Sequence, residues 1–141
     1  MTENMKKAVS MLNEQALTLA AVNGNETITS RERGVKPLLA LIDGGKTLEG
    51  YSAADKVVGA AAAYMYVLLG VRELYANVIS RRAAEILEKY GIEFEYGTLA
   101  EAIKNRAGTG FCPMETAVFE AVSPENALML IRAKLKELSR R

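Results

Sequence analysis

The pattern of apolar and polar residues predicts that the chain opens with a helix and a β-hairpin. Apolar residues at helical spacing predict a first helix over residues 3–13. The apolar run at residues 16–22 favours a strand, and the Asn23-Gly24 pair is a strong signal for a two-residue turn. Residues 27–29 are expected to form the returning strand of an antiparallel hairpin.

The middle of the chain predicts two further helices. Pro37 near the first turn and Gly44-Gly45 at the end delimit one helix over residues 38–42. Ser52-Ala53-Ala54-Asp55 matches the Ser-x-x-acid capping box and predicts a helix over residues 56–69. Because that segment is apolar on nearly every side, we expect its helix to lie in the middle of the domain.

The second half alternates strand and helix patterns. The predicted segments are a strand at 74–79, a helix at 81–90 capped by Ser80 and ended by Gly91, a strand at 92–96, a short helix from the capping box Thr98-Leu99-Ala100-Glu101 through Lys104, a helix at 113–122, and a last helix begun by Ser123-Pro124-Glu125. This order predicts an α/β fold, a three-layer sandwich with a mixed sheet. The length of 141 residues predicts a single domain over residues 1–141.

Composition removes several classes of function. The net charge is +1, and basic and acidic residues are interleaved, so we expect no nucleic-acid partner. The chain has no histidine and one cysteine, which excludes the common zinc ligand sets and the Ser-His-Asp and Cys-His mechanisms. A general base must therefore be Asp, Glu, Lys or Tyr, and we expect no metal and no other cofactor.

The same counts bear on the compartment. One cysteine cannot form an intramolecular disulfide, which favours a reducing compartment. Residues 1–15 carry charges throughout and lack the apolar region of a signal peptide. The longest apolar run, residues 57–71, is shorter than the roughly 20 residues of a membrane span. We expect a cytoplasmic protein without a membrane partner.

The strongest chemical candidate is Cys112, which precedes Pro113 at a predicted helix start. The positive end of a helix dipole favours the thiolate, so Cys112 is a candidate nucleophile. Asp55, Lys56 and Glu115 join it if the two predicted helix starts converge. The alternative interpretations are a half-buried cysteine without chemistry, capping roles for the two acids, and a solvent-exposed lysine.

A second candidate site is a glycine-rich loop. Arg106 with the backbone amides of Gly108, Thr109 and Gly110 is a candidate pocket for a phosphate or carboxylate. An ordinary flexible loop is the alternative. The polar segment Ser30-Arg31-Glu32-Arg33 is predicted to be a solvated turn.

The hairpin followed by alternating helices and strands, with polar residues at two helix starts, resembles the cytidine-deaminase-like fold. In that family one helix start carries His- or Cys-x-Glu and the other Pro-Cys-x-x-Cys, which together hold a zinc-bound water. By this resemblance Asp55 stands at the His position, Cys112 and Glu115 at the two Cys positions, and Val57 at the proton-shuttling Glu. The zinc motif is thus absent. In deaminase-like folds the loop that corresponds to Ser30-Arg31-Glu32-Arg33 borders the pocket, so the resemblance implies that position as the alternative to a solvated turn.

A closer resemblance covers nearly the whole chain. Residues 51–59 and 105–116 are similar to segments of a family of small prokaryotic proteins known only as a domain of unknown function. The resemblance implies a deaminase-like fold without zinc. It also implies a homo-oligomer, since deaminases of this architecture are often oligomeric.

Three functional hypotheses follow. In the first, the protein uses Cys112 chemically on a small anionic molecule, of which a nucleotide is one candidate. In the second, it is a ligand-binding or interaction module without turnover. The third hypothesis is a metal held by Asp55, Cys112 and Glu115; we favour a pocket without metal between the two helix starts.

Overall fold

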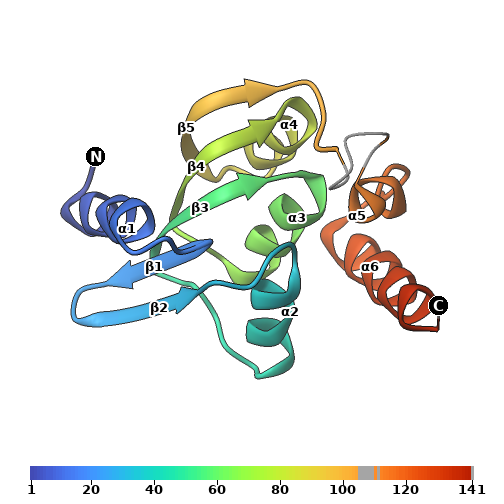
Figure 1. Ribbon diagram of the computed structural model, residues 1–141, viewed down its shortest axis with the longest axis horizontal. Coiled ribbons are helices and arrows are strands. Elements are labelled where there is room, and N and C mark those ends of the chain that lie inside the picture. The colour runs from blue at the N-terminus through green and yellow to red at the C-terminus, as the bar shows by residue number, and fades with distance from the viewer. Residues whose placement is uncertain (105–109, 111, 141) are drawn as a thin grey trace.

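The protein is a five-stranded sheet with helices on both faces (Figure 1). The computed structural model describes residues 1–104, 110 and 112–140. The elements in chain order are α1 (Glu3–Glu14), β1 (Leu19–Asn23), β2 (Glu26–Ser30), α2 (Lys36–Asp43), β3 (Ser52–Val58), α3 (Ala60–Leu69), β4 (Glu73–Ser80), α4 (Arg81–Lys89), β5 (Glu93–Ala100), α5 (Pro113–Ala117) and α6 (Pro124–Ser139).

The sheet is mixed and has the strand order β2-β1-β3-β4-β5. β1 is antiparallel to both β2 and β3, whereas β3, β4 and β5 are parallel to one another. Leu19 at the start of β1 lies opposite Asp55 near the end of β3. The predicted α/β class and mixed sheet are confirmed, and the start of β1 lies beside the carboxyl end of β3.

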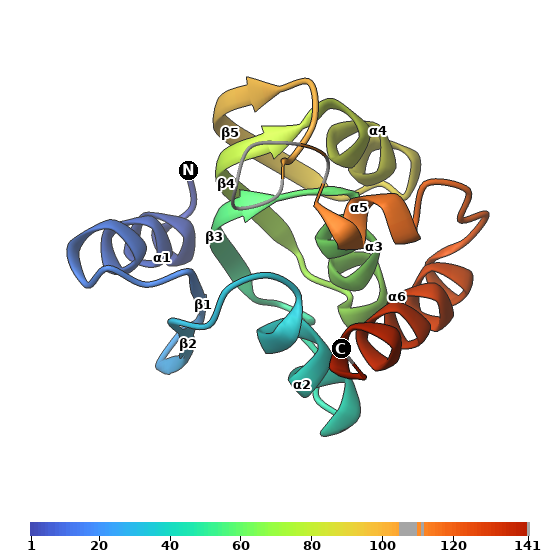
Figure 2. The same ribbon diagram turned by 45° about the vertical axis from the view of Figure 1, so that its right-hand side comes forward.

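Two separate cores lie on the two faces of the sheet. On one face α1 packs on β1 and β3 through Met5, Ala8 and Leu12. On the other face α2, α3 and α4 form the larger core, and α5 and α6 pack outside α3 (Figures 1 and 2). This arrangement leaves the carboxyl end of β3 facing the starts of α2, α3 and α5.

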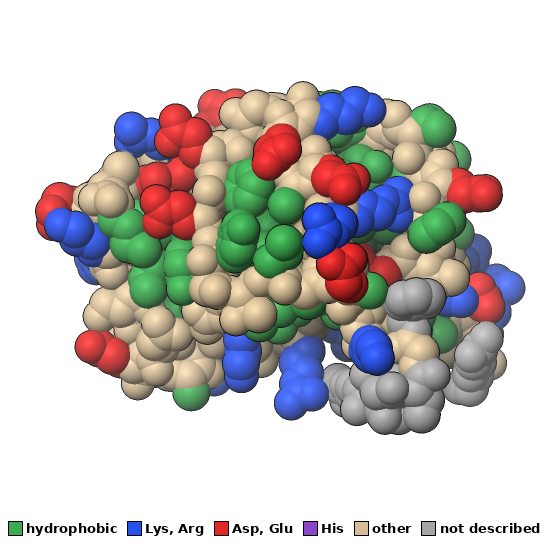
Figure 3. Space-filling model, turned by 90° about the horizontal axis from the view of Figure 1, so that it is seen from above, with side chains coloured by type: hydrophobic (Ala, Val, Ile, Leu, Met, Phe, Trp, Pro, Cys, Tyr) green, Lys and Arg blue, Asp and Glu red, His purple; other side chains and the backbone are tan. Residues whose placement is uncertain are grey.

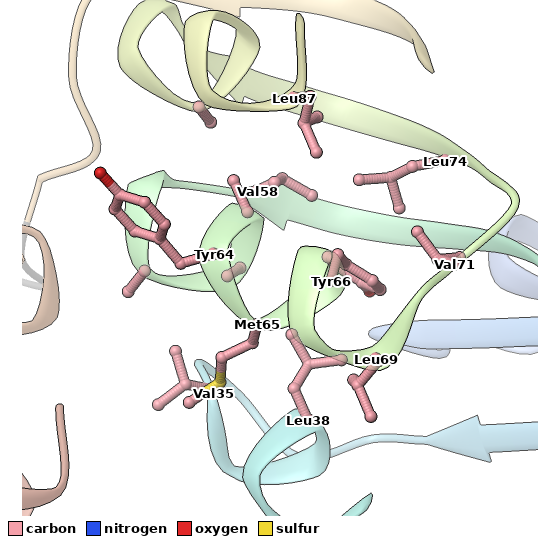
Figure 4. Packing of buried hydrophobic residues seen from close by; sticks show 14 of the residues in the cluster. Val35, Leu38, Val58, Tyr64, Met65, Tyr66, Leu69, Val71, Leu74 and Leu87 are labelled. Atoms are coloured by element: carbon pink, nitrogen blue, oxygen red, sulfur yellow. The ribbon is translucent and has the colours of Figure 1, made fainter. Parts of the chain in front are cut away.

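The central helix is α3, as its apolar sequence predicts. Tyr66 and Met65 are fully buried, and they pack among Leu38, Leu74 and Leu87 from three other elements (Figure 4). Burying each of these side chains contributes roughly 1.5–3 kcal/mol. No helix in the described part of the chain is long and apolar enough to cross a membrane.

Several local predictions are confirmed. The antiparallel hairpin is confirmed, although its two turn residues are Gly24 and Asn25, one position later than the predicted Asn23-Gly24 pair. Gly24 has a φ of +61°, a left-handed conformation that glycine adopts readily. The hydroxyl of Ser80 accepts a hydrogen bond from the backbone nitrogen of Ala83 at 3.1 Å, which caps α4. Ser123 caps α6 in the same way.

The capping box predicted at Ser52-Ala53-Ala54-Asp55 is wrong, because this segment is the central strand β3. It pairs with β1 on one side and β4 on the other, and Ser52, Ala53 and Ala54 are fully buried. The Ser52 hydroxyl donates to the carboxylate of Glu73 instead of capping a helix. Asp55 and Lys56 therefore lie on a strand, and α3 begins later, with Gly59 as its N-cap.

The capping box predicted at Thr98-Leu99-Ala100-Glu101 is also wrong. β5 continues through Ala100, because Thr98 to Ala100 pair with β4. The carboxylate of Glu101 binds the guanidinium of Arg81 at 2.6 Å. Glu101, which the sequence placed in a capping box, thus forms an ion pair with the first residue of α4.

Two element boundaries differ from the predictions. The first strand begins at Leu19 and not at Ala16, because Ala16 has a φ of +54° and the chain turns there after α1. The helix at Pro113 ends at Ala117. The backbone nitrogen of Phe119 then bonds the carbonyl of Thr116, so the chain tightens into turns before α6.

β5 is an edge strand whose side chains are exposed or partly exposed. Viewed from the β5 side, hydrophobic side chains gather in the middle of the surface, with acidic and basic ones around them (Figure 3). The exposed large apolar residues of β5 are Tyr96 and Leu99. Glu93 and Glu95 place charge on the same strand, which disfavours pairing with another chain.

Candidate functional site

A cavity of about 620 Å³ lies at the edge where β1 begins and β3 ends. The starts of α2, α3 and α5 complete its walls. Lining residues come from segments far apart in the sequence, and they are Thr18, Leu19, Glu32, Arg33, Gly34, Val35, Pro37, Leu38, Asp55, Lys56, Val57, Gly59, Ala61, Ala62, Ile103, Lys104, Cys112, Pro113, Met114 and Glu115. Asp55, Lys56, Cys112 and Glu115, which the sequence singled out, thus share one cavity.

Asp55 has no cationic partner among the residues that the structure describes. Its Oδ2 accepts a hydrogen bond from the hydroxyl of Tyr66 at 2.6 Å, and its Oδ1 accepts one from the backbone nitrogen of Val57 at 3.3 Å. Burial raises the pKa of Asp55 to about 7, although these hydrogen bonds act in the opposite direction. Near neutral pH the group therefore exists in both its protonated and its ionised form.

Tyr66 lies behind Asp55 in the core. Burial, together with the negative charge of Asp55, raises the pKa of the Tyr66 hydroxyl well above its ordinary value. Tyr66 thus stays a neutral hydrogen-bond donor that fixes the orientation of the Asp55 carboxyl.

Glu115 caps a helix that is not its own. Its carboxylate accepts hydrogen bonds from the backbone nitrogens of Ala60 at 2.6 Å and Ala61 at 3.0 Å, the first residues of α3. A side chain at Gly59 would collide with this carboxylate. Two of the free N–H groups at the start of α3, those of Ala60 and Ala61, are therefore satisfied by Glu115 and are not open to a ligand.

Cys112 is the N-cap residue of α5, as predicted, and Pro113 follows it. Its backbone nitrogen donates to the carbonyl of Ile103 at 3.0 Å, which ties the start of α5 to the segment after β5. The residue is half-buried and lines the cavity. Because α5 has only five residues, its dipole is small and cannot alone activate the thiol.

Three cations line the cavity: Arg33, Lys56 and Lys104. None of them forms an ion pair with a residue in the described ranges. Nothing in the sequence singled out Lys104. The sequence favoured a solvated turn for the segment that contains Arg33, whereas the resemblance to deaminase-like folds implied that this loop borders the pocket, and Glu32 and Arg33 do line the cavity. The signal available for Arg33 was its position before Gly34, in the loop that leads from β2 to α2.

The structure describes only part of the glycine-rich loop that was predicted to bind an anion. Arg106, Gly108 and Thr109 lie outside the described residues. Gly110 is described, is exposed, and is not among the residues that line the cavity. This part of the predicted site stays a prediction.

The mixed metal set of Asp55, Cys112 and Glu115 is not assembled. Within residues 1–104, 110 and 112–140, no group of three or more cysteine and acidic side chains is placed to hold a metal ion. Both oxygens of Glu115 already accept backbone hydrogen bonds, and Asp55 binds Tyr66. The described geometry therefore gives no support to a metal held by these three residues.

Comparison with known proteins assigns the chain to a family whose description names no activity. The model of the family described as "Domain of unknown function (DUF1893)" matches residues 7–135. A solved structure, that of the DUF1893 family protein TM1506 from Thermotoga maritima, is similar with a TM-score of 0.85 and 30% identity, over 97% of this chain and 92% of that chain. No curated protein matches. The protein belongs to the DUF1893 family.

Proposed function

We propose that the protein binds an anionic small molecule in the cavity between β1, β3 and the starts of α2, α3 and α5. The observation that carries this proposal is the set of three cations, Arg33, Lys56 and Lys104, that line one cavity without ion-pair partners in the described chain. A bound anion supplies a counter-charge to these cations, which form no ion pair within the described residues. We infer further that the fold is cytidine-deaminase-like, on the strand and helix order, without zinc chemistry.

Much of the remaining cavity wall is apolar. Leu19, Val35, Leu38 and Met114 are all buried core residues that also line the cavity. A ligand pocket of this kind pairs an apolar wall with a few polar groups that fix orientation. The ligand therefore combines an anionic group with an apolar body, and a nucleotide is one candidate.

The acidic residues of the cavity do not cancel its positive character. Glu115 is held by the amides of α3, and the pKa of Asp55 is raised by burial to about 7. Glu32 and Glu115 are then two acids against three cations, and the charge of Glu115 is directed at the amides of α3. This balance favours an anion over a cation as the ligand.

Two versions of the function differ in the role of Cys112. In the first, its thiolate attacks an electrophilic ligand in the cavity. In the second, the protein is a binding module without turnover, and Cys112 packs as a half-buried apolar residue. Retained binding in a Cys112→Ala variant is compatible with both, so turnover and binding have to be measured separately.

Binding is tested with the fluorescent probe 8-anilinonaphthalene-1-sulfonate, an anion with an apolar body, and with its neutral analogue N-phenyl-1-naphthylamine. Val57 lines the cavity and is 43% exposed, so Val57→Phe fills space without entering the core. Val122→Phe adds the same ring at a site that is 78% exposed and is not part of the cavity.

We expect the sulfonate to bind the wild type and the Val122→Phe control, and to bind Val57→Phe about tenfold more weakly, a difference of about 1.4 kcal/mol. Lys56→Gln and Lys104→Gln weaken the sulfonate but not the neutral analogue, whereas Lys46→Gln, on the surface away from the cavity, changes neither. Equal affinities in all five variants overturn the proposed function.

A further inference from the structure

We infer that Asp55 recognises the ligand as a neutral carboxylic acid that donates its own hydrogen to an oxygen of the anion, so that binding takes up a proton. The inference rests on the proposed function, because it concerns the same cavity. It narrows the ligand to an oxyanion on an apolar body. Tyr66 does not line the cavity and is a positioning residue that holds Asp55 from behind.

The hydrogen bonds of Asp55 leave one donor for a ligand. Oδ2 accepts from the Tyr66 hydroxyl and Oδ1 accepts from the backbone nitrogen of Val57, so both partners are neutral donors. A protonated Asp55 adds its own O–H, and the residue stands in the cavity wall. The natural acceptor for that hydrogen is a carboxylate, phosphate or sulfonate oxygen.

Charged and titratable groups reach this cavity from several elements. β1 brings none through Thr18 and Leu19, and β4 brings none through Ala76, the pairing partner of Asp55. The others are Tyr66 on α3, Glu32 and Arg33 before α2, Lys56 on β3, Lys104 after β5, and Cys112 and Glu115 at the start of α5. No ion pair joins Asp55 to any of these cations in the part of the chain that is described.

An anion in this cavity opposes ionisation of Asp55. Two negative groups that share a desolvated site repel each other, so one of them keeps a proton. Burial already holds the pKa of Asp55 near 7 in the free protein, and a bound anion raises it further. The three cations attract the anion, whereas the anion binds best when the Asp55 carboxyl is protonated.

The test measures 8-anilinonaphthalene-1-sulfonate affinity between pH 5.5 and 8.5, a range in which the sulfonate itself does not titrate. We expect the wild type to bind about tenfold more weakly at pH 8.5 than at pH 6, which corresponds to a proton bound about ten times more tightly in the complex. Asp55→Asn, which keeps a neutral group of the same shape, should bind independently of pH. The neutral analogue should also show no pH dependence with the wild type.

Two further variants separate Asp55 from its neighbours. Tyr66→Phe removes a hydrogen bond that lowers the pKa of Asp55, so it should move the pH profile to higher pH. Tyr64→Phe, the matched control on α3 whose hydroxyl donates to the carbonyl of Ala121 and does not line the cavity, should keep the wild-type profile.

The outcomes distinguish this inference from the proposed function. If the probe binds the wild type, is weakened by Val57→Phe and shows the same affinity at every pH, the inference about Asp55 is overturned and the anion pocket stands. A pH profile that persists unchanged in Asp55→Asn also overturns it. If Val57→Phe and the lysine variants have no effect on the probe, the proposed function itself fails.

Discussion

The carboxylate of Glu115 closes the N-terminus of α3, and its Oε1 lies 2.6 Å from the backbone nitrogen of Ala60. The two residues are 55 positions apart in the chain, so one side chain joins α5 to the central helix. The same contact forms one wall of the cavity, because Gly59 and Glu115 both line it. The position of Cys112, three residues before Glu115, therefore depends on this link.

We expect Glu115→Gln to lower the free energy of unfolding by about 1–3 kcal/mol, because an ionised acceptor at a helix N-terminus is replaced by a neutral one. Urea unfolding measures the change. Glu120→Gln is the matched control at an exposed position, where we expect less than about 0.5 kcal/mol. Equal stabilities of the two variants would contradict the capping role of Glu115.

A second prediction concerns Gly59, whose extended backbone, with φ −98° and ψ −177°, is open to any residue. Gly59→Ala should destabilise the protein only because the new Cβ displaces the Glu115 carboxylate. In a double-mutant cycle, Gly59→Ala should therefore cost much less in a Glu115→Ala background than in the wild type. Additive effects in the cycle would show that Gly59 is needed for some other reason.

The sequence predicted those features that depend on local hydrogen bonds. Ser80 and Ser123 each precede an apolar helical pattern, and each caps the helix that follows. Ser52 carries the same local signal with an acid three residues later, yet it lies on β3. Ser52 differs from Ser80 and Ser123 because its segment pairs with two neighbouring strands, and a local sequence pattern does not indicate such pairing.

Only part of the candidate site was predicted, because only part of it depends on local sequence. Cys112 as a helix N-cap depends on Pro113 beside it and is visible in the sequence. Arg33 and Lys104 reach the cavity only because β1 runs antiparallel to β3 and because the chain after β5 returns toward α5. Arg33 has only the weak signal of its position before Gly34, and Lys104 has none, because both reach the cavity through the tertiary fold.

Ser52 offers a test of the buried polar contact on β3. Its hydroxyl is fully buried and donates to the carboxylate of Glu73, which also accepts from Thr2. Burial alone raises the pKa of Glu73, but these two hydroxyls, with the positive charges of Arg72 and the N-terminal amine, outweigh it and lower the pKa.

Ser52→Ala should therefore raise the pKa of Glu73 and reduce the free energy of unfolding by about 1–2 kcal/mol. Carbon-detected NMR titration of the Glu73 carboxyl and urea unfolding measure the two effects. Ser10→Ala, at an exposed position of α1, is the control and should change neither. An unshifted Glu73 titration would show that the Ser52 hydroxyl does not stabilise the carboxylate.

The pH dependence of stability should carry the signature of Asp55. Its folded-state pKa of about 7 lies above the ordinary 3.8, so the folded protein holds this proton more tightly than the unfolded chain does. The resulting stabilisation is complete below about pH 4 and is lost as the pH rises through 7. Between these values the free energy of unfolding falls by up to roughly 1.4 kcal/mol per pH unit.

Asp55→Asn removes this titration, so the variant should gain stability relative to the wild type as the pH rises from 4.5 to 8. Urea unfolding of both proteins across that range gives the difference in their free energies of unfolding. Contributions from Glu73, which titrates in both proteins, cancel in this difference. Parallel curves for the two proteins would mean that Asp55 titrates alike in the folded and unfolded states.

The last prediction places the thiol of Cys112 inside the ligand cavity. Because Cys112 lines the cavity and is half-buried, a bound ligand should slow its alkylation by iodoacetamide. We expect saturating 8-anilinonaphthalene-1-sulfonate to reduce the rate about tenfold, in proportion to the fraction of unliganded protein. Val57→Phe should slow alkylation without any ligand, whereas Val122→Phe should react like the wild type.

The pH dependence of the same reaction separates the two versions of the function. A nucleophilic Cys112 requires a thiol pKa below the ordinary value of about 8.5, and a rate profile centred there or above removes the cysteine-dependent version. Protection by the probe together with such an ordinary profile would favour the binding module. If the probe does not protect Cys112 although it binds, the thiol faces away from the ligand and neither version can use it.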